Sequence, residues 1–328
     1  MKVLVYNYRD FDEKPWFDRF AAELGIELVI CREAPELGKN IDLSKGCEAL
    51  SIITTKIPGE MVEEFYKNGV RYISTRTIGY DHIDLKKCEE LGIKVGNAVY
   101  GPEGVADYTV MLMLMCIRKM KRIMQRAEIN DFSLKGIQGR ELKDFSVGVI
   151  GTGRIGKTVV KNLSGFGCKI YAYDKFQNEE TKQFAEYVNL EELLQKSDII
   201  TLHTPLTDEN FHLLNDKTIS MMKDNSVIIN TARGGLIDSK ALISALKSGK
   251  LSACGLDVVE NEFGLYYNDL KSDMLDNDSL MILRSMPNVI VTPHMAFYTD
   301  NAIRDMVGNS LKSIKAFYDK TENPWQVL

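Results

Sequence analysis

The sequence predicts an α/β protein built from two doubly wound parallel sheets. Short β-rich runs alternate with amphipathic segments of helix length over residues 1–97, and the same alternation resumes at residue 145. A glycine-rich turn follows the first strand of the second series. The chain has 328 residues, which is enough for two domains with sizeable cores.

The first series predicts one α/β domain. Its strands are expected at residues 2–8, 27–31, 49–54, 71–74 and 93–95, and its helices at 16–24, 59–68 and 84–91. Ligands of such sheets bind at the carboxyl ends of the strands. Ile53 and residues 74–79 are therefore candidate binding positions.

A long helix at residues 102–128, with Pro102 in its first turn, is predicted to bridge the domains. The second sheet is expected to use strands at 147–150, 168–173, 199–202, 227–230, 253–256 and 289–291. Residues 258–286 read as a long irregular insertion, a kind of loop that is usually functional or mobile. A last helix at 300–318 is expected to return to the first domain. The predicted domains are therefore 1–100 plus 297–328, and 101–296.

Residues 147–156 combine a buried strand with a G-x-G-x-x-G turn that opens a helix. Gly151 allows the tight turn, Gly153 lets the backbone approach a pyrophosphate, and Gly156 lets the helix pack on the strand. Asp174 ends the next strand, where a carboxylate can bind both ribose hydroxyls and would repel a 2′-phosphate. The pattern indicates a Rossmann domain that binds NAD. The alternative, a glycine-tolerant turn that binds no ligand, is less favoured.

Three further strand ends carry reactive side chains. Arg233 follows one strand and is suited to grip a carboxylate, although a surface arginine is the simpler alternative. Acidic residues follow the next strand at 257–262, and His294 follows the last. A carboxylate that orients a histidine and stabilises its imidazolium is a common acid–base arrangement. The other histidines, His82, His203 and His212, are expected to be structural or adjacent to a cofactor.

Composition excludes several classes of function. The net charge is −5 with both signs interspersed, so no basic face for nucleic acid and no polybasic membrane anchor is expected. The longest apolar stretch, residues 110–117, is too short to span a bilayer. The first residues predict a strand and not a signal peptide, so a cytoplasmic location is expected. Six scattered cysteines indicate reduced structural thiols and no metal site.

Five segments together carry a family resemblance: residues 74–84, 147–156, 231–235, 256–262 and 292–299. In this order, and over essentially the whole chain, they resemble the D-specific 2-hydroxyacid dehydrogenases, and within that family the D-lactate dehydrogenase-like branch. The resemblance implies NAD as cofactor and a flavodoxin-like substrate domain beside the Rossmann domain. It also implies a homodimer built around the bridging helix, with which the methionines of residues 110–124 are consistent.

The resemblance assigns roles by position. Arg233 resembles the arginine that binds the substrate's carboxylate and carbonyl, His294 the proton donor and acceptor, and Glu262 the acid bonded to that histidine. Other residues implied to contact substrate are Ile53, Tyr100, Tyr298 and, through their backbone N–H groups, Ile78 and Gly79. Residues implied to surround NAD are Gly151, Gly153, Arg154, Ile155, Gly156, Asp174, Thr204, Pro205, Asn210, Thr231, Ala232, Arg233 and Asp257. An indirect influence of Asp257 on the histidine is also expected.

The implied reaction is reversible reduction of a 2-oxo acid by hydride from NADH, of the pyruvate to D-lactate type. Bulkier substrates such as 4-methyl-2-oxopentanoate or phenylpyruvate stay open, because Ile53 is aliphatic where lactate-directed relatives often carry tyrosine. A non-catalytic NAD-sensing regulator is a more distant alternative. The partner expected in every case is a small molecule.

Overall fold

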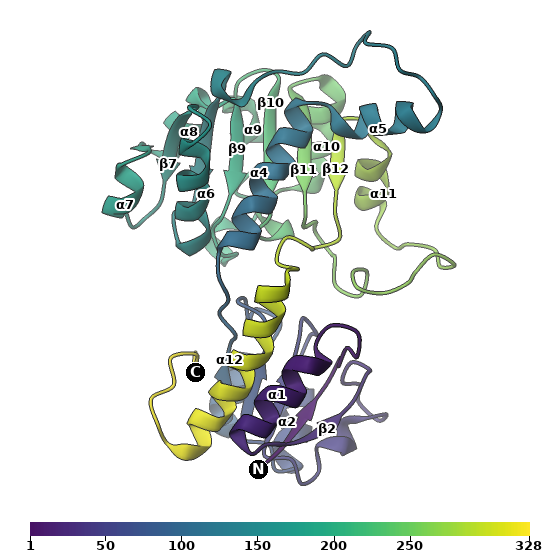
Figure 1. Ribbon diagram of the computed structural model, residues 1–328, viewed down its shortest axis with the longest axis vertical. Helices are drawn as coiled ribbons and strands as arrows, with labels where there is room; N and C mark the ends of the chain where they lie inside the picture. The colour runs from purple at the N-terminus through teal and green to yellow at the C-terminus, as the bar shows by residue number, and fades with distance from the viewer. The chain divides into compact units, whose positions relative to one another are not determined.

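The computed structural model describes all residues from Met1 to Leu328 and divides the chain into two compact units. The first unit comprises Met1–Gly101 and Tyr298–Leu328, and the second comprises Pro102–Phe297. Each unit contains one sheet in which all strand pairs are parallel (Figure 1). The predicted fold class of two parallel-sheet α/β domains is therefore confirmed.

The first unit has a five-stranded sheet in the order β2-β1-β3-β4-β5. Its strands are β1 Lys2–Val5, β2 Glu27–Ile30, β3 Ala49–Ile52, β4 Tyr72–Thr75 and β5 Lys94–Gly96. Its helices are α1 Lys14–Leu24, α2 Gly59–Lys67, α3 Leu85–Leu91 and α12 Asp300–Asp319, with a 3₁₀ turn η1 at Ile41–Ser44.

Alternation along β1 explains why both faces of this sheet are covered. Val3 and Val5 pack in one apolar cluster with side chains of α1 and α12, and Leu4 packs in a second cluster with side chains of α2 and α3. Successive side chains of a strand point to opposite faces, so a continuous apolar run serves both. The final helix α12 lies beside α1 (Figure 1), although nearly 300 residues separate them in sequence.

The second unit has a seven-stranded sheet in the order β12-β11-β10-β9-β6-β7-β8. Its strands are β6 Ser146–Ile150, β7 Lys169–Tyr173, β8 Glu186–Tyr187, β9 Ile199–Leu202, β10 Ser226–Asn230, β11 Leu251–Leu256 and β12 Val289–Val291. Its helices are α4 Glu103–Ile117, α5 Met120–Glu128, α6 Arg154–Ser164, α7 Glu179–Lys182, α8 Leu190–Lys196, α9 Asp216–Met221, α10 Ser239–Ser248 and α11 Asp278–Ser285, with 3₁₀ turns η2 Leu142–Asp144, η3 Asp208–Asn210 and η4 Gly234–Leu236.

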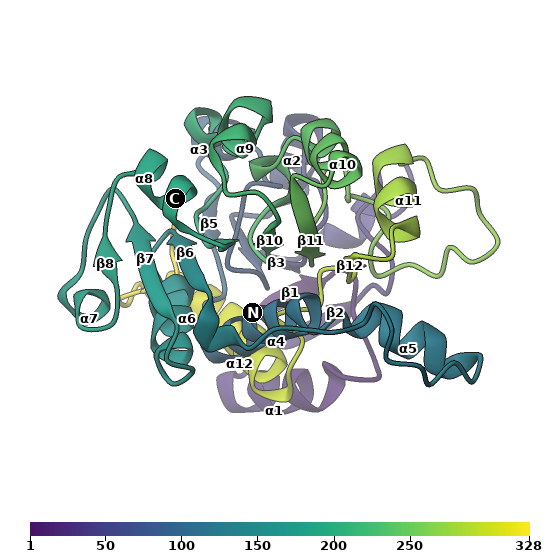
Figure 2. The same cartoon turned by 90° about the horizontal axis from the view of Figure 1, so that it is seen from above.

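Strand order in this sheet reverses between β6 and β9. From β6 the chain continues outward through β7 and β8, and then returns to the other side of β6 for β9 to β12. Figure 2 shows β7 and β8 on one side of β6 and β10, β11 and β12 on the other. Side chains of α4 and α6 share one apolar cluster with the sheet, and side chains of α8, α9, α10 and α11 share the other. A crevice at such a reversal, outside the carboxyl ends of the strands, is where doubly wound sheets bind ligands.

The prediction of one continuous helix at 102–128 is wrong. Helix α4 ends at Ile117, Lys119 takes a left-handed conformation with φ of +55°, and α5 begins at Met120. The physical reason is a change of surroundings: α4 buries Leu112 and Met113 completely against the sheet, whereas α5 has no buried residue. A helix that leaves the core needs a break in direction, and sequence periodicity does not show where it falls.

Two smaller predictions also need correction. The insertion at 258–286 is not wholly irregular, because α11 begins inside it, where the Asn277 side chain accepts the backbone N–H of Leu280 at 3.0 Å. Strand β8, Glu186–Tyr187, was not predicted, since a two-residue edge strand is too short for an alternating pattern to be visible.

A fully buried ion pair fastens the carboxyl ends of three strands in the first unit. Arg76 follows β4, and its Nε donates to Glu13 Oε1 at 3.0 Å. Its other nitrogens donate to the Ser51 carbonyl at 3.1 Å and the Tyr6 carbonyl at 3.0 Å. Both members of the pair have 0% exposure. The charges are tolerated because every bond that water would have made is replaced.

Replacing Arg76 by methionine should lower the free energy of unfolding of the first unit by about 3 kcal/mol, because Glu13 stays buried without its main partner. Urea unfolding followed by tryptophan fluorescence measures this unit selectively, since both tryptophans, Trp16 and Trp325, belong to it. The control is Lys14→Met, which removes an exposed ion pair to Asp18 and should cost less than about 1 kcal/mol. Equal effects of the two substitutions would contradict the account.

Candidate active site

The glycine-rich turn after β6 is built by close packing. Gly151 has φ of +90°, and a Cβ there would lie 2.7 Å from the carbonyl oxygen of His203. A Cβ on Gly156 would lie 1.9 Å from the carbonyl oxygen of Gly151, whereas one on Gly153 would meet nothing within 4 Å. Gly151 and Gly156 are thus required by the protein itself, and Gly153 leaves its side of the turn open to a ligand.

The turn aims the start of α6 at that open side. Arg154 and Ile155 are the first two residues of the helix, and the N-cap residue Gly153 supplies no side-chain cap. The first turn contains no acidic residue. Its N–H groups and the positive end of the helix dipole therefore suit an anion such as a pyrophosphate.

Asp174 follows β7, the strand next to β6. Its carboxylate accepts the backbone N–H of Thr152 at 2.6 Å and that of Phe176 at 2.9 Å. The side chain is held against the glycine-rich turn, where a ribose attached to the pyrophosphate would lie. These residues fit NAD: the glycines and α6 suit the pyrophosphate, and Asp174 suits the ribose.

The predicted cofactor residues Thr204, Pro205 and Asn210 lie together on the loop after β9. Asn210 uses both ends of its amide inside this loop: its oxygen accepts the Thr207 N–H at 2.7 Å, and its nitrogen donates to the Pro205 carbonyl at 2.7 Å. The structure therefore shows Asn210 shaping the loop.

A buried asparagine folds the loop after β10. Asn230 accepts the N–H of Ala232 at 3.0 Å and donates to the carbonyl of Arg233 at 2.9 Å. Thr231 shares a hydrogen bond of 2.9 Å with Thr109 of α4. A Cβ on Gly234 would lie 2.1 Å from the carbonyl carbon of Val259, so this loop rests directly on the loop after β11.

The loops after β11 and β12 bring Glu262 and His294 together. His294 Nδ1 lies 2.6 Å from Glu262 Oε1, with the two side chains 20% and 14% exposed. The second carboxylate oxygen accepts the backbone N–H of Val259 at 3.0 Å. Because Nδ1 faces the carboxylate, Nε2 is the nitrogen that can exchange a proton with a substrate.

His294 is held in an unusual backbone conformation, with φ of +52°. Asp257, which has 0% exposure, accepts the Thr292 hydroxyl at 2.6 Å and the N–H groups of Met295 and Ala296 at 2.8 Å each. Burial raises the pKa of Asp257, and the three hydrogen bonds oppose that rise. The side chain of Asp257 thus fixes the turn that carries His294. An influence of Asp257 on the chemistry of the histidine stays a prediction.

Two aromatic residues near His294 were not predicted from sequence. Tyr267 donates from its hydroxyl to the His294 carbonyl at 2.8 Å, and Phe297 lies edge-on with ring centroids 6.5 Å apart. Phe297 is close to His294 in sequence, but Tyr267 comes from the insertion, 27 residues away. No local pattern connects that tyrosine to the histidine.

The remaining predicted substrate residues belong to the first unit, at or near the carboxyl ends of its strands. Ile53 follows β3 and is 6% exposed. Ile78 and Gly79 follow β4, and their carbonyls accept the Asn97 amide at 2.8 Å and the Thr77 hydroxyl at 2.6 Å, respectively. Tyr100 follows β5, and Tyr298, just before α12, donates to Asp12 at 2.8 Å.

The other histidines differ from His294. Burial lowers the pKa of His203 to about 3, so it stays neutral. His82 shares a hydrogen bond of 3.1 Å with Thr75. His212 makes a second histidine–carboxylate pair, with Nε2 2.6 Å from Glu260 Oε1. No group of three or more His, Cys, Asp or Glu side chains is arranged to hold a metal ion, and none of the helices has the length and apolar character needed to cross a membrane.

Known proteins share extensive sequence similarity with this chain. Residues 110–296 match the family model for the NAD-binding domain of D-isomer specific 2-hydroxyacid dehydrogenases. The chain is 42% identical over 321 residues to an aromatic 2-oxoacid reductase of Clostridium sporogenes, covering 97% of this chain and 96% of that one. It is 37% identical over 317 residues to a D-lactate dehydrogenase of Escherichia coli, covering 96% of each.

A solved structure extends the likeness to the whole fold. The NAD-complexed form of a D-isomer specific 2-hydroxyacid dehydrogenase from Lactobacillus delbrueckii ssp. bulgaricus superposes with a TM-score of 0.83 at 28% identity, covering 100% of both chains. The chain therefore belongs to the D-isomer specific 2-hydroxyacid dehydrogenase family and is an NAD-dependent oxidoreductase that acts on the CH–OH group of its donors.

Proposed function

We propose that this dehydrogenase reduces bulky 2-oxo acids, aromatic or branched, in preference to pyruvate. The observation that carries the choice is Ile53, an aliphatic residue at the carboxyl end of β3 among the predicted substrate positions. A tyrosine there would fill space that isoleucine leaves for a larger side chain. The higher identity to an aromatic 2-oxoacid reductase than to a D-lactate dehydrogenase supports the same preference.

In the proposed reaction, Arg233 binds the carboxylate and carbonyl of the substrate, and the N–H groups of Ile78 and Gly79 bind the carboxylate. NADH, when bound, supplies the hydride that reduces the carbonyl carbon. His294 donates the proton from Nε2 to the carbonyl oxygen, and Arg233 stabilises the negative charge that develops there. Glu262, at 2.6 Å from Nδ1, orients the His294 ring. In the oxidising direction, neutral His294 accepts the hydroxyl proton.

The cofactor contacts belong to the same proposal. The first turn of α6, with Gly153, Arg154 and Ile155, receives the pyrophosphate, and Asp174 receives the adenine ribose. The loops after β9, β10 and β11 complete the cofactor site with the residues predicted from sequence: Thr204, Pro205, Asn210, Thr231, Ala232, Arg233 and Asp257.

Replacement of His294 by asparagine should reduce kcat by about 10²- to 10⁴-fold, because the proton donor is lost. Asparagine suits this position, since it tolerates the left-handed backbone conformation that His294 adopts. Steady-state rates in both directions measure the loss. NADH binding, followed by fluorescence, should stay near the wild-type value; turnover within about threefold of wild type would remove His294 from the mechanism.

Substrate preference is measured by NADH consumption with phenylpyruvate, 4-methyl-2-oxopentanoate and pyruvate. We expect kcat/KM to be about 10-fold or more higher for a bulky acid than for pyruvate, the scale set by a few methylene groups in a pocket. Ile53→Tyr should reverse this order, whereas the volume-matched control Ile53→Leu should keep it. A clear preference of the wild type for pyruvate would show that something other than Ile53 sets the pocket size.

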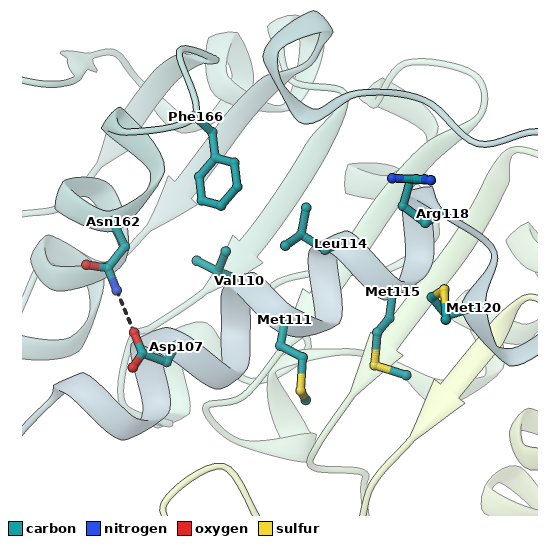
Figure 3. A pocket seen from close by; sticks show the side chains of 9 residues that line it. All are labelled: Asp107, Val110, Met111, Leu114, Met115, Arg118, Met120, Asn162 and Phe166. Carbon is teal, nitrogen blue, oxygen red and sulfur yellow. Dashed lines mark hydrogen bonds between the residues drawn. The ribbon is translucent and has the colours of Figure 1, made fainter.

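We also propose that the enzyme is a homodimer formed through α4 and α5. A groove of about 640 Å³ runs along α4, and Figure 3 shows the methionines of that helix beside it. Its lining is mostly apolar: Val110, Met111, Leu114, Met115, Met120 and Phe166, with Asp107, Arg118 and Asn162. The segment after α5 exposes Ile129, Phe132 and Leu134 by 76%, 77% and 83%. Apolar surface of this kind favours contact with another chain.

Light scattering should therefore give a mass twice the 37.1 kDa of one chain. The double substitution Phe132→Asp with Leu134→Asp should shift the protein toward the single-chain mass, because charges are costly to bury in a contact. Met274→Asp is the control, since Met274 is 99% exposed on the insertion and lies outside α4 and α5. A single-chain mass for the wild type, or an equal effect of the control, would contradict the dimer.

We also propose that the enzyme works in the cytoplasm. All six cysteines are buried free thiols, which suits a reducing compartment.

A further inference from the structure

The second histidine–carboxylate pair has no place in the reaction described above. Glu260 uses both carboxylate oxygens: Oε1 lies 2.6 Å from His212 Nε2, and Oε2 accepts the N–H of Ser239 at 2.9 Å. Ser239 is the first residue of α10, so the carboxylate also meets the positive end of that helix. Both side chains of the pair are mostly buried, at 30% and 20% exposure.

The pair joins three loops that carry the proposed active-site residues. His212 lies on the loop after β9, and its backbone N–H donates to the carbonyl of Gly235 at 2.8 Å on the loop after β10. Glu260 lies on the loop after β11, where Gly234 packs against its backbone nitrogen, leaving 2.5 Å to a Cβ at that glycine. Arg233 precedes Gly234 directly, and Glu262 follows Glu260 by two residues.

The turn between the two glutamates is restrained by its own hydrogen bonds. Asn261, between them, is in the left-handed conformation with φ of +58°. The carbonyl of Glu260 accepts the Asn277 amide at 2.9 Å, and the Glu262 carboxylate accepts the N–H of Val259 at 3.0 Å. Only Asn261 separates the two glutamates in this turn, so we expect a shift of the anchored Glu260 side chain to alter the position of the carboxylate that faces His294.

We propose that His212 and Glu260 are positioning residues of this dehydrogenase, whose hydrogen bond holds Glu262 against His294 and steadies the loop of Arg233. The inference rests on the proposed roles of His294, Glu262 and Arg233. Neither His212 nor Glu260 is assigned to substrate or cofactor, so their effect passes through the turn. The charged groups around His212 are Glu260 and, at 3.9 Å, Asp238. Those around His294 are Glu262, Asp257 and the Tyr267 hydroxyl that binds its carbonyl.

The test compares His212→Leu, which removes the donor, with His212→Gln, whose amide nitrogen can replace Nε2. His212 has φ of +53°, so both variants carry a similar backbone strain and differ in the hydrogen bond. For the leucine variant, we expect kcat to fall about 10-fold or more, since misplacing a catalytic group by an ångström costs up to about 100-fold. The acid limb of the pH profile for hydroxy-acid oxidation should move to lower pH, because the imidazolium loses its stabilising carboxylate. The glutamine variant should recover most of both properties, and the NADH dissociation constant should stay within about threefold of wild type.

Glu262→Gln provides the benchmark, since it removes the same carboxylate charge directly and should move the acid limb in the same direction. Asp269→Asn is the matched control: it removes an exposed carboxylate from the same long loop, where Asp269 pairs with Lys271. Should His212→Leu not yield folded protein, Glu260→Gln makes the same test, because a glutamine has one acceptor oxygen where Glu260 uses two.

The inference is overturned if the acid limb stays in place in both His212→Leu and Glu260→Gln. In that case the variants would show only lower thermal stability or weaker NADH binding. That result would make the pair a fold element or a support for the cofactor loop. Failure of the proposed function looks different. In that case His294→Asn and Glu262→Gln would leave turnover and its pH profile unchanged, whatever the His212 variants do.

Discussion

The position of every proposed catalytic and cofactor-binding residue depends on one geometric constraint, the parallel direction of the strands. In a parallel sheet all carboxyl ends meet at one edge, so loops far apart in sequence become neighbours. In the second unit this edge gathers the glycine-rich turn after β6, Asp174 after β7, Arg233 after β10, Glu262 after β11 and His294 after β12. Covering helices on both faces leave that edge as the place where polar side chains can be concentrated.

Buried polar groups then convert this rough proximity into defined geometry. Asp257 and Asn230 are both fully buried. Asp257 hydrogen-bonds to the turn that carries His294, and Asn230 hydrogen-bonds within the loop that carries Arg233. Arg76 does the same in the first unit by bonding the ends of β1 and β3. A buried charge or amide is costly unless fully bonded, so such groups have few alternative arrangements. The left-handed backbone at His294 persists because these bonds surround it.

The features that local sequence patterns did not reveal depend on tertiary contacts. The break at Lys119 depends on where α4 stops touching the sheet, which is a tertiary contact and not a property of the local pattern. The start of α11 inside the insertion depends on an asparagine cap whose neighbours show no long apolar repeat. Conversely, every strand except the two-residue β8 was recognisable, because continuous β-rich apolar runs are what a strand buried on two faces requires.

The sequence by itself determined the two-sheet fold class and the glycine-rich turn followed by Asp174, because these motifs are local and their spacing follows from backbone geometry. Arg233, Glu262 and His294 were candidates at strand ends, and their proposed roles came from the resemblance to a family. Only the tertiary structure decided which side chains meet. Tyr267 reaches His294 across 27 residues and His212 reaches Glu260 across 48, and such partners are chosen by the packing of separate loops, which no local spacing encodes.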